Sequence, residues 1–278
     1  MLRYMTTMLY ILAAILILYF IVLMGIWWLQ HFIIFHPVRL DQYYEFQFGA
    51  AYQELRLPST DGSTEISALH FKVEAARQKK KVVLYCHGNA DNIQRWGEHH
   101  AEFLARGYDF FVWDYRGYGK TKGHASLENI YADAQQCYDY LLQQYDNQDI
   151  ILYGRSLGTG IAAMLTAQNN STLLFLETPY DTILGVFHAK APLFYLPKIL
   201  KYNFSTTRFL PQIQCVVCVM HGTKDEIISY GRAKKLIPFL KKEDIFITFP
   251  DGKHKNLNTF ALYHETLDTV LTQYEQIK

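Results

Sequence analysis

Cysteine is scarce in this sequence, and net charge is almost absent. Four cysteines among 278 residues do not make a disulfide framework, and they leave the redox compartment open. A formal net charge of +1 offers no electrostatic footprint for nucleic acid, so we expect no nucleic-acid partner. Cys215 and Cys218 spell C-x-x-C, but they fall on an expected buried strand, where residues three apart point to opposite faces. We interpret all four thiols as core residues and expect no metal site.

Charge is also missing from one long apolar run near the N-terminus. No charged side chain occurs from Met8 to Leu29, and residues 10–29 read YILAAILILYFIVLMGIWWL. About 20 apolar residues in a helix cross the hydrocarbon layer of a bilayer. Trp27 and Trp28 stand near one end, where aromatic rings favour the membrane interface. A cleaved signal peptide has a shorter run that ends in small residues. We therefore expect an uncleaved, single-pass anchor over about residues 8–29, with the lipid bilayer as a partner.

The flanking charges leave the orientation of this anchor open. Arg3 lies on one side and Arg39 on the other. The free amine next to Arg3 favours a cytoplasmic N-terminus, which in a bacterium would place the rest of the chain in the periplasm. We expect residues 1–40 to form the anchor and a short linker, and residues 41–278 to form one domain. A protein that starts near Gln42, without residues 1–35, is expected to be soluble and active.

After the anchor, hydrophobic runs alternate with helical patterns, which is typical of a βαβ protein. The first two strands flank the turn sequence 59–63 and predict an antiparallel hairpin. Residues 187–210, rich in Phe, Tyr, Leu and Pro, break the alternation, so we expect a cap-like insertion over about residues 182–212. The predicted fold class is α/β, with a mostly parallel eight-stranded sheet and helices on both faces. Strands are expected at Tyr52–Leu57, Ile66–Val73, Val82–Cys86, Phe110–Tyr115, Ile150–Tyr153, Leu173–Leu176, Cys215–Met220 and Ile245–Phe249, and helices near Ile93–Arg106, Leu127–Gln144, Leu157–Ala167, Gly231–Leu240 and Thr259–Gln276.

One short motif carries the chemistry. Gly154-Arg155-Ser156-Leu157-Gly158 follows an expected strand and opens an expected helix. G-x-S-x-G in this strand–turn–helix context is the nucleophile elbow of serine hydrolases. Glycines flank the serine because the turn is too sharp for side chains there. The motif predicts Ser156 as a nucleophile.

A serine hydroxyl needs a base, and the base needs an acid to orient it, in the chain order Ser, acid, His. His254 is the expected base because it follows the last strand and precedes the last helix. For the acid we favour Asp225, in the loop after the penultimate strand. Asp181 and Glu177 remain alternatives, because they follow the preceding strand. The other histidines considered are expected to brace loops, pack or lie on the surface: His87, His99, His100, His221 and His264.

The oxyanion of a tetrahedral intermediate needs two backbone donors. One is expected to be the N–H of Leu157, directly after the nucleophile. The other should come from the loop after the strand Val82–Cys86, where we assign the N–H of Asn89 and keep Ala90 as the alternative.

Taken together, these motifs resemble the single-helix-anchored α/β-hydrolases of the wider prolyl-oligopeptidase and serine-aminopeptidase superfamily. The likeness extends to bacterial membrane hydrolases and, more distantly, to animal α/β-hydrolase-domain depalmitoylases. It implies Ser156, Asp225 and His254 as the triad, Asn89 and Leu157 as oxyanion donors, and residues 114–119 as a structural loop beside the site. The segments that carry it are HGNA (87–90), DYRGYGKTKG (114–123), GRSLGTG (154–160), HGTKDEII (221–228) and His254.

The expected function is a serine hydrolase without cofactors that cleaves an ester or thioester through an acyl-Ser156 intermediate. A lipid-like acyl group is favoured, because an anchor would hold the site near such substrates. A serine peptidase of the same superfamily is one alternative. A catalytically idle, membrane-bound interaction module is the other, since a fold does not guarantee a function.

Overall fold

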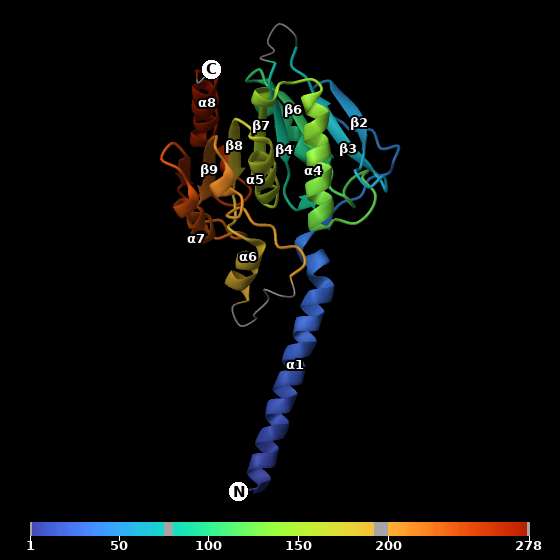
Figure 1. Ribbon diagram of the computed structural model, residues 1–278, viewed down its shortest axis with the longest axis vertical. Coiled ribbons are helices and arrows are strands. Elements are labelled where there is room, and N and C mark those ends of the chain that lie inside the picture. Colours follow the sequence, from blue (N-terminus) through green and yellow to red (C-terminus); the bar gives the residue numbers. More distant parts are fainter. Residues whose placement is uncertain (1, 75–79, 192–199, 277–278) are drawn as a thin grey trace.

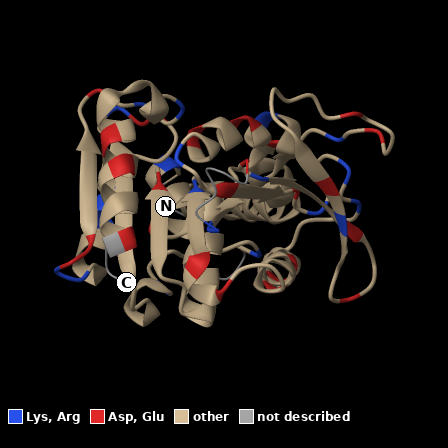
Figure 2. Cartoon of the chain, turned by 90° about the horizontal axis from the view of Figure 1, so that it is seen from above, with Lys and Arg blue, Asp and Glu red and all other residues tan. Residues whose placement is uncertain are grey.

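The computed structural model describes residues 2–74, 80–191 and 200–276. A long exposed helix, α1 (Leu2–Ile34), projects from a domain in which helices cover both faces of a twisted sheet (Figure 1). Residues Arg3–Ile34 are long and apolar enough to cross a membrane, by length and composition. Lys and Arg residues and Asp and Glu residues are interspersed along the chain of the domain (Figure 2).

The sheet has eight strands in the order β10-β9-β8-β7-β4-β6-β3-β2. β3 pairs antiparallel with both of its neighbours, β2 and β6, and the other neighbouring strands pair in parallel. This confirms the predicted fold class, including the N-terminal hairpin, in which Tyr52 pairs with Phe71. The strands are β2 (Tyr52–Pro58), β3 (Glu65–Phe71), β4 (Val82–Cys86), β6 (Asp109–Trp113), β7 (Ile150–Arg155), β8 (Leu173–Glu177), β9 (Val216–Gly222) and β10 (Ile245–Phe249).

Alternation along the strands divides the core into two layers. In β4, Leu84 faces the layer under α4 (Leu127–Leu142) and α5 (Gly158–Asn169), whereas Val83 and Tyr85 face the layer under α8 (Ala261–Gln276). All three side chains are fully buried. Because helices cover both faces of the sheet, the expected place for a ligand site is at the carboxyl ends of the strands and in the loops there.

Two predicted helices are interrupted. The stretch expected as one helix near 93–106 forms α2 (Ile93–Trp96), a 3₁₀ turn (Gly97–His99) and α3 (His100–Leu104). The stretch near 231–240 forms α7 (Tyr230–Ala233) and a 3₁₀ segment (Lys234–Phe239) that contains Pro238. Proline removes a backbone donor, so an α-helix does not continue there.

Between β8 and β9 the chain leaves the sheet and forms α6 (Ile183–Lys190), a helix that the sequence patterns did not predict. Figure 1 places α6 at the end of the domain from which α1 emerges. Residues 192–199 of the expected cap lie outside the described residues. The cap therefore stays a prediction.

The expected linker is paired with the domain. Residues His36–Pro37 form β1, which pairs in parallel with β5 (Ala90–Asp91). Phe35 is buried, and the N–H of Leu40 donates to Gly119 O at 2.9 Å. The expected boundary at residue 40 stays a prediction, but the chain is already in contact with the domain from the last turn of α1.

Candidate active site

Ser156 lies in a tight turn between β7 and α5, with its backbone in the left-handed region at φ 52°. That conformation is unusual for a residue with a side chain. Its N–H donates to Glu177 O at 2.9 Å, which holds the turn against β8. A Cβ on Gly154 would come within 2.6 Å of Gly158 O, and one on Gly158 would overlap Cys86 O. Both glycines of the motif are therefore required by close backbone approach.

His254 reaches Ser156 from the loop after β10. Its Nε2 lies 3.0 Å from Ser156 Oγ, and both residues are buried. The loop is held by the N–H of Lys253, which donates to the side chain of Asn256 at 2.7 Å. The 3.0 Å between His254 Nε2 and Ser156 Oγ is within the range for proton transfer from a hydroxyl to an imidazole.

Asp225 lies on the other side of the His254 ring. Its Oδ2 is 2.7 Å from His254 Nδ1, and its Oδ1 accepts the N–H groups of Ile227 and Ile228, each at 2.8 Å. These two bonds fix the plane of the carboxylate. The structure thus brings together the three residues that the sequence predicted as a triad, in a serine–imidazole–carboxylate chain.

A second histidine lies behind this carboxylate. His221 Nε2 is 3.5 Å from Asp225 Oδ2, and its Nδ1 contacts Gly222 O at 3.0 Å. Burial lowers the pKa of His221, although the neighbouring Asp225 carboxylate opposes this shift. From the sequence we expected His221 only to brace a loop, to pack or to lie on the surface, so this contact was not predicted.

The alternative acids are engaged elsewhere. Asp181 pairs with Arg232, whose Nε lies 2.8 Å from Oδ1. Glu177 accepts the hydroxyl of Tyr153 at 2.8 Å and lies 3.4 Å from Arg155 Nε. Asp181 stands just before α6, but the side chain that caps this helix is that of Thr182, which accepts the N–H of Gly185 at 2.9 Å.

The two expected oxyanion donors, Asn89 and Leu157, line the cleft beside Ser156. Within the described chain neither backbone N–H has an acceptor, so both remain available. Asn89 is held in place by three hydrogen bonds that do not use its backbone N–H. Its side-chain amide donates to Ile34 O at 2.9 Å, and its carbonyl accepts the N–H of His36 at 2.9 Å and the Tyr118 hydroxyl at 2.7 Å.

Other histidines considered at first brace the surrounding structure. His87 stacks on Tyr115 with ring centroids 3.9 Å apart, and burial lowers its pKa to about 3. His100 stacks on Phe71, and His99 lies 3.1 Å from Arg155 Nη1. None of these contacts involves the triad.

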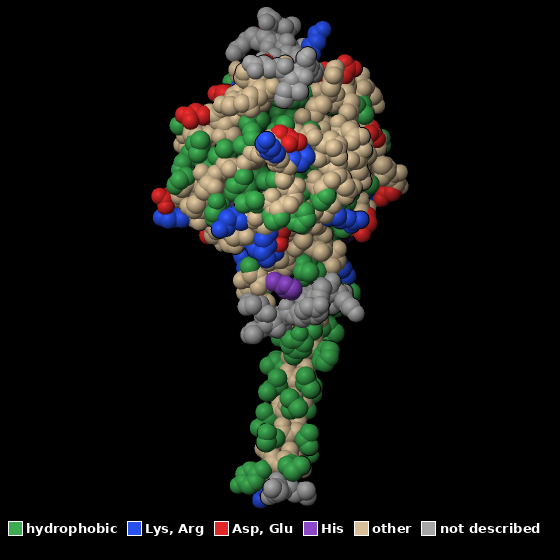
Figure 3. Space-filling model, turned by 60° about the vertical axis from the view of Figure 1, so that its left-hand side comes forward, with side chains coloured by type: hydrophobic (Ala, Val, Ile, Leu, Met, Phe, Trp, Pro, Cys, Tyr) green, Lys and Arg blue, Asp and Glu red, His purple; other side chains and the backbone are tan. Residues whose placement is uncertain are grey.

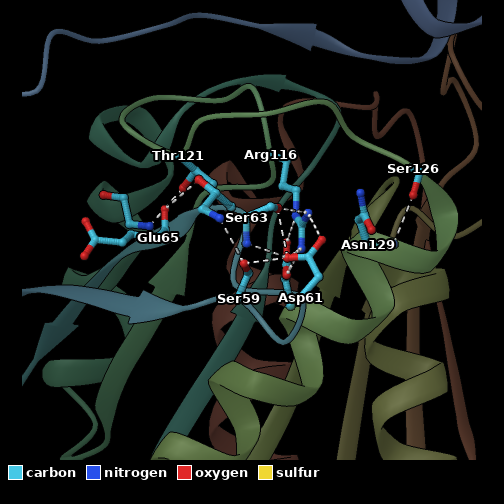
Figure 4. A network of polar contacts seen from close by, with 11 residues as sticks. Ser59, Asp61, Ser63, Glu65, Arg116, Thr121, Ser126 and Asn129 are labelled. Atoms are coloured by element: carbon cyan, nitrogen blue, oxygen red, sulfur yellow. Dashed lines mark hydrogen bonds and ion pairs between the residues drawn. The ribbon is translucent and has the colours of Figure 1, made fainter.

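The loop 114–119 is anchored through its arginine. Arg116 is buried and donates from Nε to Asp133 on α4 and from Nη1 to Asp61 in the β2–β3 turn, both at 2.7 Å. Figure 4 shows Arg116 pointing at Asp61 beside Ser59 and Ser63. The loop therefore links the hairpin, the sheet and α4 close to the site.

Cys218 is buried in β9, whereas Cys215 lies just before that strand and is only half-buried, so the expectation that both fall on a buried strand was wrong for Cys215. All four cysteines are free, and burial raises the pKa of Cys215 and Cys218 to about 12. A thiol of such high pKa is a poor nucleophile and a poor metal ligand. Among the residues that the structure describes, no cluster of His, Cys, Asp and Glu could hold a metal ion.

The triad opens into a cleft of about 440 Å³, a size typical of ligand sites. Its apolar wall comes from three separate parts of the chain: Ile33 and Ile34 at the end of α1, Ile183, Val186 and Phe187 on α6, and Ile227 and Ile228 after Asp225. The cleft therefore lies between the catalytic loops and the base of the N-terminal helix.

Comparison with known sequences identifies a matching family and several relatives. Residues 77–179 match the family described as serine aminopeptidase, S33. Alpha/beta hydrolase domain-containing protein 17B of Xenopus tropicalis is 26% identical over 208 residues, covering 72% of this chain and 69% of that protein. An uncharacterized protein of Mycobacterium tuberculosis is 26% identical over 176 residues, which is 63% of each chain.

Solved structures share the fold. An esterase of Pyrococcus furiosus superposes with a TM-score of 0.69 at 15% identity, covering 87% of this chain and 98% of the esterase. An esterase of Exiguobacterium antarcticum gives a TM-score of 0.61 at 19% identity, covering 79% of this chain and all of that one. At these identities the likeness establishes the fold.

Proposed function

We propose that this chain, which has the α/β-hydrolase fold and matches the serine aminopeptidase, S33, family over residues 77–179, is a serine hydrolase. It cleaves esters or thioesters through an acyl-Ser156 intermediate. The observation that carries the proposal is the continuous chain Ser156–His254–Asp225, with contacts of 3.0 and 2.7 Å.

In the first half-reaction, His254 Nε2 takes the hydroxyl proton of Ser156 while Oγ attacks the carbonyl carbon. The N–H groups of Leu157 and Asn89 stabilise the oxyanion that forms. Asp225 holds the His254 tautomer and stabilises the imidazolium. The proton then passes to the leaving alcohol or thiol, and the acyl group stays on Ser156. Water, deprotonated by His254, then attacks the acyl-serine. The bond to Ser156 Oγ breaks, His254 returns the proton to Oγ, and a carboxylic acid is released.

The apolar wall of the cleft supports an acyl substrate, because it offers buried surface to an alkyl chain and few hydrogen-bond partners to a peptide backbone. The likeness to depalmitoylases supports thioesters as substrates, and the likeness to esterases supports esters. A peptidase activity is the second candidate, favoured by the matched aminopeptidase family.

We propose further that α1 is a permanent membrane anchor. Its last turn is part of the site, since Ile33 and Ile34 line the cleft and Ile34 O accepts the Asn89 amide. Gln30, also in α1, is buried and accepts the N–H of Lys201 at 2.6 Å. Removal of the helix as a signal peptide would take these contacts away.

The test is labelling of the full chain by a fluorophosphonate probe, followed by turnover of p-nitrophenyl esters of graded chain length and of peptide p-nitroanilides. Wild type is expected to be labelled and to hydrolyse the esters, and Ser156→Ala to do neither while it melts at the same temperature. Faster turnover of the anilides would favour the peptidase. Absence of labelling in folded wild type would favour an idle module.

A further inference from the structure

The cleft around Ser156 carries charge of one sign only. None of its described lining residues is acidic, and four are cationic: Arg95, Arg155, Lys190 and Lys255. The whole chain is nearly neutral, with 27 Lys and Arg against 26 Asp and Glu. The excess is therefore local to the cleft, where low-dielectric walls strengthen its effect on a charged ligand.

Two of these four cations, Lys190 and Lys255, are not paired with a carboxylate in the described parts of the chain, whereas the two arginines are. Arg155 lies 3.4 Å from Glu177, and Arg95 lies 3.5 Å from Asp91, so each has a carboxylate nearby. Lys190, the last residue of α6, and Lys255, next to His254, are exposed. Neither has a carboxylate partner in the described parts of the chain. An anion bound between α6 and the His254 loop would meet both.

The cleft also lies close to the expected bilayer surface. Lys201 Nζ is 3.6 Å from the centroid of Trp27, at the end of the apolar run where tryptophan marks the interface. A helix rises 1.5 Å per residue, so Ile33 in the cleft wall is only about 8 Å along α1 from Trp28. Figure 3 shows the exposed apolar helix meeting the domain at an end where Lys and Arg side chains occur.

From this placement we propose that the substrate is a membrane lipid with an anionic headgroup. Its acyl chain packs against Ile33 and Phe187, and its phosphate lies near Lys190 and Lys255. The inference rests on the proposed function. Water cleaves the acyl ester bond, giving a fatty acid and a lysolipid whose freed hydroxyl takes the proton from His254. The lipid reaches Ser156 from the bilayer without crossing the aqueous phase.

The experiment uses the full chain in nanodiscs of ether-linked phosphatidylcholine, a host without ester bonds. Phosphatidylglycerol or phosphatidylcholine with identical ester-linked chains is added at a few mole per cent, and fatty acid release is followed by mass spectrometry. Wild type is expected to cleave phosphatidylglycerol about tenfold faster, equivalent to about 1.4 kcal/mol. Hexanoyl-coenzyme A tests a soluble anionic thioester as the alternative source of the charge.

The double variant Lys190→Glu/Lys255→Glu is expected to reverse the preference. The matched control is Lys235→Glu/Lys242→Glu, two exposed lysines outside the cleft with the same change in net charge. It should keep the wild-type preference. The ratio of the two lipids is taken within each protein, so that a general loss of turnover cancels. Lys190→Gln alone, farther along the chain from His254, should lower the ratio without reversing it.

Equal rates on the two lipids, with p-nitrophenyl ester turnover intact, would overturn the lipid assignment and leave the proposed function standing. Faster turnover of hexanoyl-coenzyme A than of phosphatidylglycerol would also overturn it. Loss of both ester turnover and probe labelling in wild type would instead remove the proposed function itself.

Discussion

The side-chain amide of Asn89 donates a hydrogen bond of 2.9 Å to the carbonyl oxygen of Ile34, the last residue of α1. The same loop accepts the N–H of His36 on Asn89 O. The expected oxyanion loop is therefore held by the end of the N-terminal helix. Because a helix leaves its last carbonyls without partners, Asn89 satisfies a group that would otherwise be unpaired.

This contact argues against the expectation from the sequence that a protein starting near Gln42 keeps its activity. Deletion of residues 2–26 should preserve turnover of soluble esters, because it leaves Gln30, Ile34 and Phe35 in place. Deletion through Leu40 should lower turnover at least tenfold, since the Asn89 loop loses its partners and the cleft loses one wall. Both proteins are compared with wild type on p-nitrophenyl butyrate and by thermal melting. Equal activity of the two deletions would show that the base of α1 is only a tether.

Replacement of the acid should separate Asp225 from Asp181. Asp225→Asn is expected to lower kcat by about four orders of magnitude, because the amide no longer holds the His254 tautomer that accepts the serine proton. Asp181→Asn should keep most of the rate, since Asp181 pairs with Arg232. Steady-state rates are measured on variants of equal melting temperature. The opposite ranking would move the triad acid to the loop after β8.

The buried ion pair of Arg116 should matter more for stability than an exposed pair. Arg116→Met leaves the carboxylate of Asp133, which is fully buried, without its counter-charge, at a cost of about 3–5 kcal/mol. Lys224→Met breaks an exposed pair with Asp251 and should cost less than about 1 kcal/mol. Urea unfolding monitored by circular dichroism measures both. Similar costs for the two variants would contradict the structural role assigned to residues 114–119.

Acid should destabilise the fold partly through His70. Burial lowers the pKa of His70 from its usual 6.5 to about 4, so the unfolded chain binds a proton before the folded chain does. The stability this group contributes is complete above pH 6.5 and is lost as the pH falls toward 4. Between about pH 7 and pH 5 the loss is about 2 kcal/mol. His70→Gln keeps a polar partner for the Tyr145 hydroxyl, 3.0 Å away, but cannot titrate.

The free energy of unfolding of His70→Gln is measured by urea titration at pH 7 and pH 5. Between these pH values it should fall by about 2 kcal/mol less than that of wild type. An identical fall in both proteins would show that the His70 pKa is not depressed.

The sequence by itself determined the sheet and the nucleophile turn. Strand periodicity is local, and Val83 and Leu84 reveal opposite core faces by alternation alone. The G-x-S-x-G motif likewise predicts the nucleophile turn locally, since the turn excludes side chains at Gly154 and Gly158. Helix continuity was less well predicted, because Pro238 and the 3₁₀ turn at Gly97 interrupt apolar patterns that read as single helices.

Only the tertiary structure decided which residues from distant segments meet. Chain order favoured Asp225 over Asp181, but the partner of each carboxylate depends on how the loops after β8 and β9 fold, and Arg232 reaches Asp181 from 51 positions away. Nor does any local pattern link Ile34 to Asn89, or place Lys190 and Lys255 around one cleft. Such contacts depend on the way the sheet stacks its carboxyl ends beside the base of α1, and no window of sequence contains both partners.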